Sequence, residues 1–373
     1  MKRSVAYYFY SFWAIFLILF TLIGCQQPLI FENNEKVGGL LSESVLQATP
    51  VKSESSENFD IDKIDGMTLV APPNPFSSNP FVKLKEIDAN WVGIIPYAYT
   101  RQGNPSVSFG VNSWQWWGET VKGATESIRQ AHANDMLVML KPQVYIPGSW
   151  PGGMDFDSEA DWNKWEKDYE KYILTFARIA SEQNVALFCI GTEFKLSSVN
   201  RPEFWNGLIR KIRNIYNGKL TYAANWDEYK HITFWDKLDY IGIDAYFPLN
   251  SDAVPAVEEL VSNWYPYEKE IKRIASSFDK PILFTEYGYM SVEGCTGKTW
   301  ELEADRSVLK YNEQAQANAF DAMYKVFYGK DYWAGGFIWK WYPDEFAGPQ
   351  RMRKDYTPQN KIGEQILAKW YAK

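Results

Sequence analysis

Histidine is nearly absent from this sequence, because the 373 residues contain only His132 and His231. Each stands alone, without a cluster of further ligands or nucleophiles around it. Zinc catalysis and a Ser-His-Asp triad both need a histidine close to other ligands or to a nucleophile. The sequence therefore argues against both, and we expect the two histidines to be ordinary surface or helix-end residues.

Cysteine is also scarce, with three residues in the chain. Cys189 lies in an apolar run and Cys295 in a predicted loop, and their spacing indicates neither a disulfide framework nor a metal site. The third cysteine, Cys25, directly follows an N-terminal segment with the features of a targeting signal.

Residues 1–24 have the features of a targeting segment. Lys2 and Arg3 precede an apolar stretch over residues 5–20, as in a secretory signal peptide. The ending Leu22-Ile-Gly-Cys25 resembles the bacterial lipobox, in which the cysteine is acylated and becomes the new N-terminus. The alternative is an uncleaved signal anchor, because the apolar stretch is of borderline length for spanning a membrane. In both interpretations the domain is exported and tethered to a membrane. In the lipobox interpretation, Cys25 carries the lipid.

The chain is acidic, with a formal net charge of −7. Removal of residues 1–24 takes away two positive charges and no acidic residue, which leaves −9. An acidic surface argues against nucleic acid or anionic lipid as the partner. Residues 25–65 are rich in Glu, Ser and Asn, which predicts a flexible tether. We therefore expect an exported protein at the cell surface, or an outer-membrane lipoprotein if the source is Gram-negative.

From Gly66 onward, short apolar runs alternate with helical patterns, which predicts an α/β domain over residues 66–373. The runs are almost entirely apolar, as in strands buried on both faces. Eight of them over about 300 residues predict a single (β/α)8 TIM barrel, with an open doubly wound sheet as the alternative. The predicted strands are 67–71, 91–97, 137–140, 186–190, 220–223, 240–243, 282–285 and 336–339.

Aromatic residues are abundant at 17%, including 17 Trp and 24 Tyr. They can form a large core, or they can line a cleft in which aromatic faces stack on sugar rings. Where aromatic residues recur at helical spacing, they form one face of a helix, which favours a place in the core. An example follows a capping box at Ser158 and Asp161, where Trp165 and Tyr169 have this spacing. The helix near residues 233–238 looks short.

Two of the apolar runs end abruptly in Thr-Glu, the fourth at Glu193 and the seventh at Glu286. A carboxylate just past a buried strand must be hydrogen-bonded, ion-paired or catalytic. Catalytic groups of a barrel lie at the C-terminal ends of its strands, and strands four and seven face each other across its mouth. The pair can thus flank one glycosidic bond, with one group protonated and the other ionised.

Four stretches, in the same order, resemble clan A of the glycoside hydrolases and, more narrowly, glycoside hydrolase family 113, a group of β-mannanases and related barrels. They are Phe188–Phe194, Tyr240–Phe247, Phe284–Gly288 and Gly335–Trp341. The resemblance implies that Glu193 is the acid/base and Glu286 the nucleophile of a retaining enzyme. It also implies a substrate of β-1,4-mannan or mannooligosaccharides. The reaction needs no metal and no organic cofactor.

One position departs from the wider clan. Most members carry Asn immediately before the acid/base, where it contacts the sugar 2-hydroxyl, whereas this chain has Thr192. The family that the chain most resembles also tends to lack that Asn. Asn225, which follows the fifth strand, is a candidate replacement or else a turn residue.

Further site residues follow from other strand ends. By the resemblance, Tyr246 holds the nucleophile, or it is a packed rim residue, and a phenol hydrogen bond would favour the ionised carboxylate. Asp244 is expected as a structural carboxylate at a strand end. Lys141 and Gln143 end the third strand, and the lysine is either a donor to substrate hydroxyls or an ion-pair partner of the carboxylates.

The eighth strand ends with Trp339 and Trp341. Residues two apart on a strand point to the same side, so we expect one of them, preferentially Trp339, to stack under the sugar. Tryptophans in the loops after strands two and three form outer subsites or pack within their loops. They are Trp114, Trp116, Trp117 and Trp150.

Two other functions compete with this prediction. The same mechanism could act on another β-glycan, such as a glucan or xylan, because mannose and glucose differ only in the orientation of one hydroxyl. A surface lipoprotein that binds glycans without cleaving them would also suit the tether and the aromatic residues. Such a protein would need neither Glu193 nor Glu286.

Overall fold

The computed structural model describes residues 62–110, 115–304, 306–343 and 348–373. The predicted signal peptide, Cys25 and nearly all of the predicted tether lie outside these ranges. Within them, no helix has both the length and the apolar character needed to cross a membrane.

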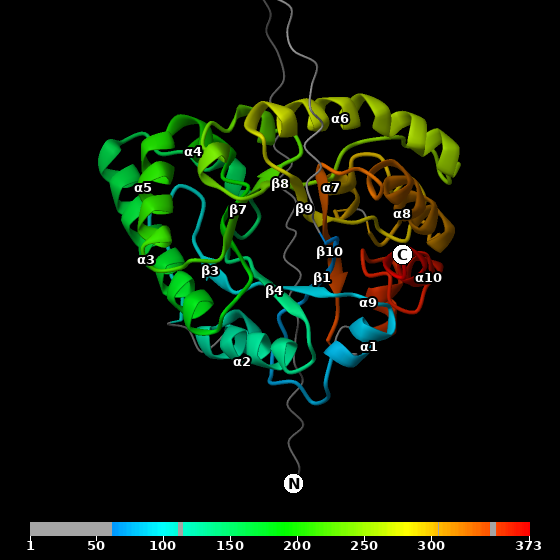
Figure 1. The fold of residues 1–373 in the computed structure, drawn as a ribbon, viewed down its shortest axis with the longest axis horizontal. Coiled ribbons are helices and arrows are strands. Elements are labelled where there is room, and N and C mark those ends of the chain that lie inside the picture. Colours follow the sequence, from blue (N-terminus) through cyan, green and yellow to red (C-terminus); the bar gives the residue numbers. More distant parts are fainter. Residues whose placement is uncertain (1–61, 111–114, 305, 344–347) are drawn as a thin grey trace, which may run out of the picture. The chain divides into compact units, whose positions relative to one another are not determined.

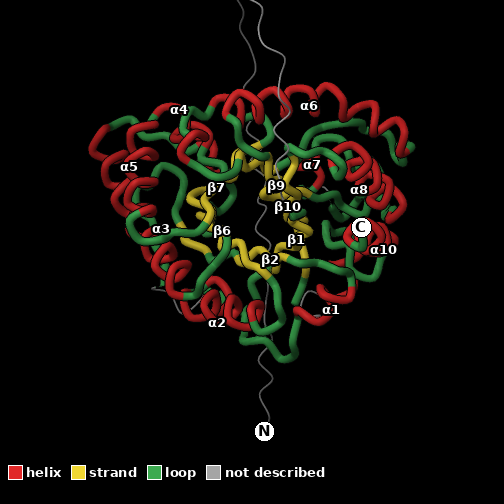
Figure 2. The backbone as a smooth tube through the Cα atoms, in the orientation of Figure 1, coloured by secondary structure: helices red, strands yellow, loops and turns green. Residues whose placement is uncertain are grey.

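Eight parallel strands form a closed barrel, and helices surround it (Figures 1 and 2). Around the barrel the order is β1-β10-β9-β8-β7-β6-β4-β2, so strands that follow each other around the ring also follow each other along the chain. The (β/α)8 prediction is confirmed, and the open sheet is excluded. The barrel strands are β1 (Ile64–Leu69), β2 (Trp91–Ile94), β4 (Leu137–Leu140), β6 (Leu187–Thr192), β7 (Lys219–Asn225), β8 (Ile241–Asp244), β9 (Ile282–Tyr287) and β10 (Trp333–Trp341).

Each predicted strand overlaps one of these eight, although most of the bounds shift by one to three residues, and two of the differences bear on the fold. β1 begins at Ile64, two residues before the predicted start of the domain. The run at 91–97 divides at Pro96, which has no N–H to donate to a sheet. Beyond it, β3 (Tyr97–Tyr99) pairs with β5 (Gln143–Tyr145) as a separate two-stranded sheet.

Two of the helices around the barrel begin at the residues that the sequence indicates. Ser158 accepts a hydrogen bond from the backbone N–H of Asp161, as predicted, and Pro202 occupies the first position of α5. The α-helices are α1 (Phe81–Glu86), α2 (Val121–His132), α3 (Glu159–Glu182), α4 (Lys195–Asn200), α5 (Pro202–Arg213), α6 (Val257–Phe278), α7 (Thr299–Leu302), α8 (Glu313–Phe327), α9 (Gly348–Arg353) and α10 (Ile362–Tyr371).

Single 3-10 turns complete the described elements. Between β7 and β8 the connection contains only two of them, in agreement with the short helix predicted there. They are η1 (Trp117–Glu119), η2 (Pro151–Gly153), η3 (Tyr229–His231) and η4 (Trp235–Lys237).

An aromatic layer packs the helices against the barrel on the side of β6. Trp165 and Tyr169 of α3 stack with ring centroids 4.9 Å apart, and Trp205 of α5 lies against the same group. The Trp205 ring comes so close to β6 that a Cβ atom on Gly191 would lie 2.7 Å from it. Only glycine fits at that position. The packing thereby fixes the strand end that carries Glu193.

Candidate active site

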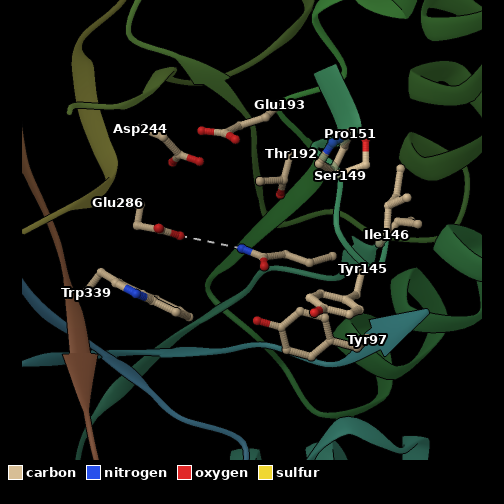
Figure 3. A pocket seen from close by; sticks show the side chains of 12 residues that line it. Tyr97, Tyr145, Ile146, Ser149, Pro151, Thr192, Glu193, Asp244, Glu286 and Trp339 are labelled. Atoms are coloured by element: carbon tan, nitrogen blue, oxygen red, sulfur yellow. Dashed lines mark hydrogen bonds between the residues drawn. The ribbon is translucent and has the colours of Figure 1, made fainter. Parts of the chain in front are cut away.

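The predicted site residues gather at the C-terminal ends of the barrel strands, which lie together at one end of the barrel. The side chains of Glu193, Asp244 and Glu286 point into one space, with Trp339 beside them (Figure 3). Glu193 follows the fourth barrel strand, β6, and Glu286 lies on the seventh, β9. The fold thus brings together the two glutamates that the sequence predicts as a pair.

Glu193 is held in an unusual backbone conformation. Its φ angle is +54°, in the left-handed region that side chains other than glycine rarely adopt. Its carboxyl oxygens accept one hydrogen bond each, from the side-chain amide of Asn225 at 3.1 Å and from the indole N–H of Trp150 at 2.5 Å. The last residue of β7 and a residue from the connection between β4 and β6 therefore fix this one carboxyl group.

The environment of Glu193 favours its neutral form. Burial raises the pKa of the Glu193 carboxyl well above its ordinary value, and the negative charges of Asp244 and Glu286 raise this pKa further. The Trp150 bond and the charge of Lys141 oppose the shift without cancelling it. A carboxyl group that stays protonated in this way can serve as a general acid.

Glu286 lies in the opposite kind of environment. The phenol of Tyr246 donates to its Oε1 at 2.6 Å, and the ammonium of Lys141 lies 2.9 Å from its Oε2. Gln143 adds a longer contact to Oε2, 3.5 Å from its amide nitrogen, shown as the dashed line in Figure 3. Negative charge on Glu286 is therefore compensated, as a carboxylate nucleophile requires.

Lys141 and Asp244 form a buried ion pair beneath Glu286. The lysine side chain is completely buried, and its ammonium lies 3.0 Å from Oδ1 of Asp244, which also accepts from the Thr285 hydroxyl at 2.8 Å. Burial lowers the pKa of Lys141, but Asp244 and Glu286 outweigh burial, so this pKa is raised. Of the two roles considered for Lys141, the geometry favours the ion-pair partner, because its ammonium is already occupied by Asp244, Glu286 and the carbonyl of Thr285.

Asp244 itself titrates far from its usual range. Burial raises its pKa to about 7, and Glu286 adds to the increase while Lys141 opposes it.

Within the described part of the chain, no group of three or more His, Cys, Asp and Glu side chains is arranged to hold a metal ion. Cys189 and Cys295 are buried and free.

Two hollows meet at the glutamate pair, and Glu193, Glu286 and Trp339 line both of them. The smaller has a volume of about 180 Å³. The larger has a volume of about 830 Å³. A ligand can therefore extend to both sides of the pair. Aromatic residues in the walls are Tyr97 and Tyr145 in the smaller hollow, and Trp150, Trp226, Tyr246, Trp300 and Tyr356 in the larger.

Trp341 does not join this site, in contrast to the prediction that residues two apart share a side. Along the β1 edge of β10, Thr68 pairs with Trp339, but the next residue, Leu69, already pairs with Trp341. This bulge interrupts the alternation that the prediction assumed. Trp341 is 2% exposed and lines separate hollows, together with residues such as Lys83 and Gln359.

The loop tryptophans divide between the two roles considered for them. Trp150 lines the larger hollow and bonds Glu193, whereas the ring of Trp117 packs against Phe76 with centroids 5.5 Å apart. Trp116 is exposed and lines neither hollow at the pair, and Trp114 lies outside the described residues.

Several aromatic residues of the cleft were not predicted from the sequence, among them Tyr97, Trp226 and Trp300. Tyr97 was included in a predicted strand, although Pro96 before it marks the strand end. Trp226 directly follows Asn225, so its place after a barrel strand could have identified it. Trp300 stands on the short helix α7 within a long connection, where no local pattern distinguishes it.

A closed parallel barrel with a carboxyl pair at the ends of its fourth and seventh strands, one with a pKa raised by burial and one in contact with a lysine and a tyrosine, defines a barrel glycosidase. The chain belongs to Glycoside Hydrolase Family 113, whose family model matches residues 74–361. It is therefore a glycoside hydrolase, as its sequence resemblance predicts. No match was found among curated proteins.

Solved structures share the fold at low identity. A β-mannanase of the same family from Alicyclobacillus acidocaldarius, solved with the ligand ManMIm, is 23% identical and superimposes with a TM-score of 0.73 over 85% of this chain and 99% of that one. A complex of a family 113 β-1,4-mannanase gives 23% identity and a TM-score of 0.71 over 84% and 99%. A Faecalibacterium prausnitzii β-glucuronidase is 15% identical, with a TM-score of 0.54 over 83% and 49%.

Proposed function

We propose that this glycoside hydrolase cleaves β-1,4-mannosidic bonds in mannan or mannooligosaccharides with retention of configuration. The contrast between Glu193 and Glu286 carries the proposal, because a retaining enzyme needs one neutral and one ionised carboxyl group at the same bond. The choice of mannan is supported by the family and by the similar structures, which are described as β-mannanases.

The reaction has two steps. In the first, an oxygen of Glu286 attacks the anomeric carbon, the glycosidic C–O bond breaks, and Glu193 gives its proton to the leaving oxygen. In the second, Glu193 takes a proton from water, whose oxygen attacks the anomeric carbon and displaces Glu286. Both carboxyl groups return to their initial states. Lys141 and Tyr246 compensate the charge that Glu286 carries before the first step and regains after the second.

Three buried oxygen atoms of residues that line the two hollows have no hydrogen-bond partner within the described part of the chain. They are Oγ1 of Thr192, Oδ1 of Asn225 and Oδ1 of Asp227. A buried polar group without a partner is costly, so the atoms of Thr192 and Asn225, the two residues next to Glu193, are suited to bind a hydroxyl group of the sugar. We propose that Asn225 takes the 2-hydroxyl contact and that Thr192 faces the smaller hollow, with Trp339 under the ring between them.

The test is hydrolysis of mannan, glucomannan, glucan and xylan side by side, with the full chain in detergent and its Glu193→Gln and Glu286→Gln variants. Release of mannooligosaccharides by the parent and by neither variant supports both substrate and mechanism. Cleavage of a different glycan by the parent alone would retain the mechanism and reject mannan. Tight binding of one glycan without cleavage would instead support the glycan-binding protein.

We also propose that the chain is an exported lipoprotein, acylated at Cys25 and held at the cell surface or the outer membrane. The support is the sequence of residues 1–25. Labelling of cells with a radioactive fatty acid tests it, since the label should enter the parent and not a Cys25→Ser variant. A Cys25→Ser variant that still sediments with membranes at full length would favour the signal anchor.

A further inference from the structure

Glu228 is a completely buried carboxylate that lies outside the glutamate pair. It follows β7 by three residues and precedes the short turn η3. Oε1 accepts hydrogen bonds from the hydroxyls of Tyr222 and Ser198, each at 2.7 Å, and Oε2 accepts from the backbone N–H of Asn225 at 2.9 Å. Burial raises the pKa of Glu228 to about 7, and the three bonds oppose the increase. A polar group that is so fully buried and bonded is expected to have a specific task.

One connection leads from Glu228 to the backbone of Glu193. The hydroxyl of Tyr222 donates to Glu228 and accepts the backbone N–H of Phe194, the residue after Glu193, at 2.8 Å. The backbone N–H of Glu193 itself donates to the carbonyl of Ala223 at 2.8 Å. The peptide units on both sides of Glu193 are therefore anchored to β7. One of them is held by the Tyr222 hydroxyl, which in turn is bonded to Glu228.

A second connection leads to the carboxyl group of Glu193. Glu228 binds the backbone N–H of Asn225, and the Asn225 side chain donates to Oε1 of Glu193 at 3.1 Å. Ser198, the third partner of Glu228, lies on helix α4, which begins two residues after Glu193. The buried carboxylate of Glu228 thus contacts β7 through Tyr222 and the backbone of Asn225, and α4 through Ser198, which are the elements beside the candidate acid/base.

The backbone of Glu193 explains why such anchoring is needed. With φ at +54°, Glu193 adopts a conformation that an L-residue keeps only where its surroundings enforce it. Without the bonds from Tyr222 and Asn225, its backbone could relax and its carboxyl group would turn away from the scissile oxygen. Displacements of about 1 Å at a reacting group can lower a rate by roughly 100-fold.

We propose that Glu228 is a positioning residue of the glycosidase reaction, which holds Glu193 in its left-handed conformation through Tyr222 and directs its carboxyl group through Asn225. This inference rests on the proposed role of Glu193 as acid/base. The positioning role of Glu228 is distinct from a general structural role, because loss of positioning predicts a defect confined to proton transfer from Glu193.

Two substrates separate these roles. A mannooligosaccharide has a poor leaving group that must receive a proton from Glu193, whereas a dinitrophenyl β-mannoside releases an anion that needs none. For both substrates kcat/KM reports the first step only, which ends with the sugar bound to the enzyme. A mispositioned acid therefore lowers kcat/KM for the oligosaccharide and leaves that for the aryl glycoside nearly unchanged.

The experiment compares Tyr222→Phe and Glu228→Gln with the parent in the full chain, together with Tyr216→Phe as a matched control. Tyr216 also has a buried hydroxyl, which donates to the carbonyl of Val185 at 2.8 Å, before β6 begins and thus at the end of that strand away from Glu193. We expect both test variants to lose roughly 10- to 100-fold in kcat/KM on the oligosaccharide and little on the aryl glycoside. The control should lose little on either substrate.

Equal losses on the two substrates, or no difference between Tyr222→Phe and Tyr216→Phe, would overturn the proposal. Tyr222→Phe keeps the buried ring and Glu228→Gln keeps the side-chain shape, so melting curves should show both variants folded. If both fail to fold, Glu228 stabilises the barrel and does not act specifically on Glu193, which also overturns it. A parent that cleaves neither substrate would count against the proposed function, independently of Glu228.

Discussion

The ammonium nitrogen of Lys141 lies 2.9 Å from Oε2 of Glu286, although the lysine side chain is completely buried. A buried cation at this distance compensates a negative charge on the carboxylate. Asp244 contacts the same ammonium at 3.0 Å. The surroundings of the proposed nucleophile are therefore built from the ends of three barrel strands, β4, β8 and β9.

Substitution of Lys141 by methionine should destabilise the protein and abolish its activity. It leaves Asp244 and Glu286 as neighbouring buried carboxylates without a cation. Removing one partner of a buried ion pair costs about 3–5 kcal/mol. The free energy of unfolding in urea would measure the loss. The double variant Lys141→Met with Asp244→Asn should recover part of it, and a loss below about 1 kcal/mol, as for an exposed pair, would contradict the buried geometry.

Removal of the Tyr246 hydroxyl should affect the reaction more than the fold. A Tyr246→Phe variant loses the 2.6 Å hydrogen bond to Glu286 and keeps the ring. Hydrogen bonds to charged groups contribute about 1.5–3 kcal/mol, so kcat/KM should fall by roughly 10- to 100-fold. Tyr267→Phe is the matched control, since its hydroxyl donates to the carbonyl of Pro248 away from the cleft. Similar kinetics for the two variants would show that Tyr246 only packs at the rim.

The pH dependence of activity should follow the protonation of Glu193. Burial and the neighbouring carboxylates raise the pKa of Glu193, and the protonated form is the active acid, so kcat/KM should fall as pH rises through this pKa. The Trp150 bond stabilises the ionised form and lowers the pKa. Trp150→Phe should therefore move the alkaline limb to higher pH.

A pH profile of kcat/KM for both forms measures this shift. Trp116→Phe is the control, because Trp116 has the same exposed fraction as Trp150, 38%, but does not line the cleft. An alkaline limb that stays in place, or moves to lower pH, would show that the indole N–H does not act on the ionised Glu193.

The barrel and its glutamate pair could be predicted because their signals are local. Strands buried on both faces form uninterrupted apolar runs, and a Thr-Glu ending of such a run is visible without any tertiary knowledge. The closed barrel then places Glu193 and Glu286 at one mouth, because strand ends share that face. Composition alone left the role of the tryptophans open. In the structure Trp165, Trp205, Trp235, Trp264 and Trp333 are core residues.

The remaining site residues depend on contacts that no local pattern encodes. Trp341 leaves the site because of a bulge in the pairing of β10 with β1. Trp150 reaches Glu193 from a different barrel connection, 43 residues earlier in the chain. Glu228 stands in a polar turn, where a glutamate is expected to be exposed, and only the packing of β7, α4 and η3 encloses it.

Substitution of Trp300 should affect long substrates more than short ones. Trp300 is 48% exposed, lines the larger hollow and stacks on Trp226 with centroids 5.7 Å apart and an angle of 15° between the rings. Its exposed ring offers a face for a sugar beyond those held directly at Glu193 and Glu286. In Trp300→Ala, kcat/KM should fall about 10-fold for mannohexaose and remain near the parent value for the shortest oligosaccharide that is cleaved.

The control for this variant is Tyr265→Ala, which removes another exposed aromatic ring, 57% accessible, from α6 outside the cleft. It should leave the dependence on chain length unchanged, because the ring lines neither hollow at the glutamate pair. Kinetics over a series of chain lengths measure both variants. Equal loss on all lengths would assign Trp300 to the structure of its loop, whereas loss that grows with length places sugar binding at this end of the larger hollow.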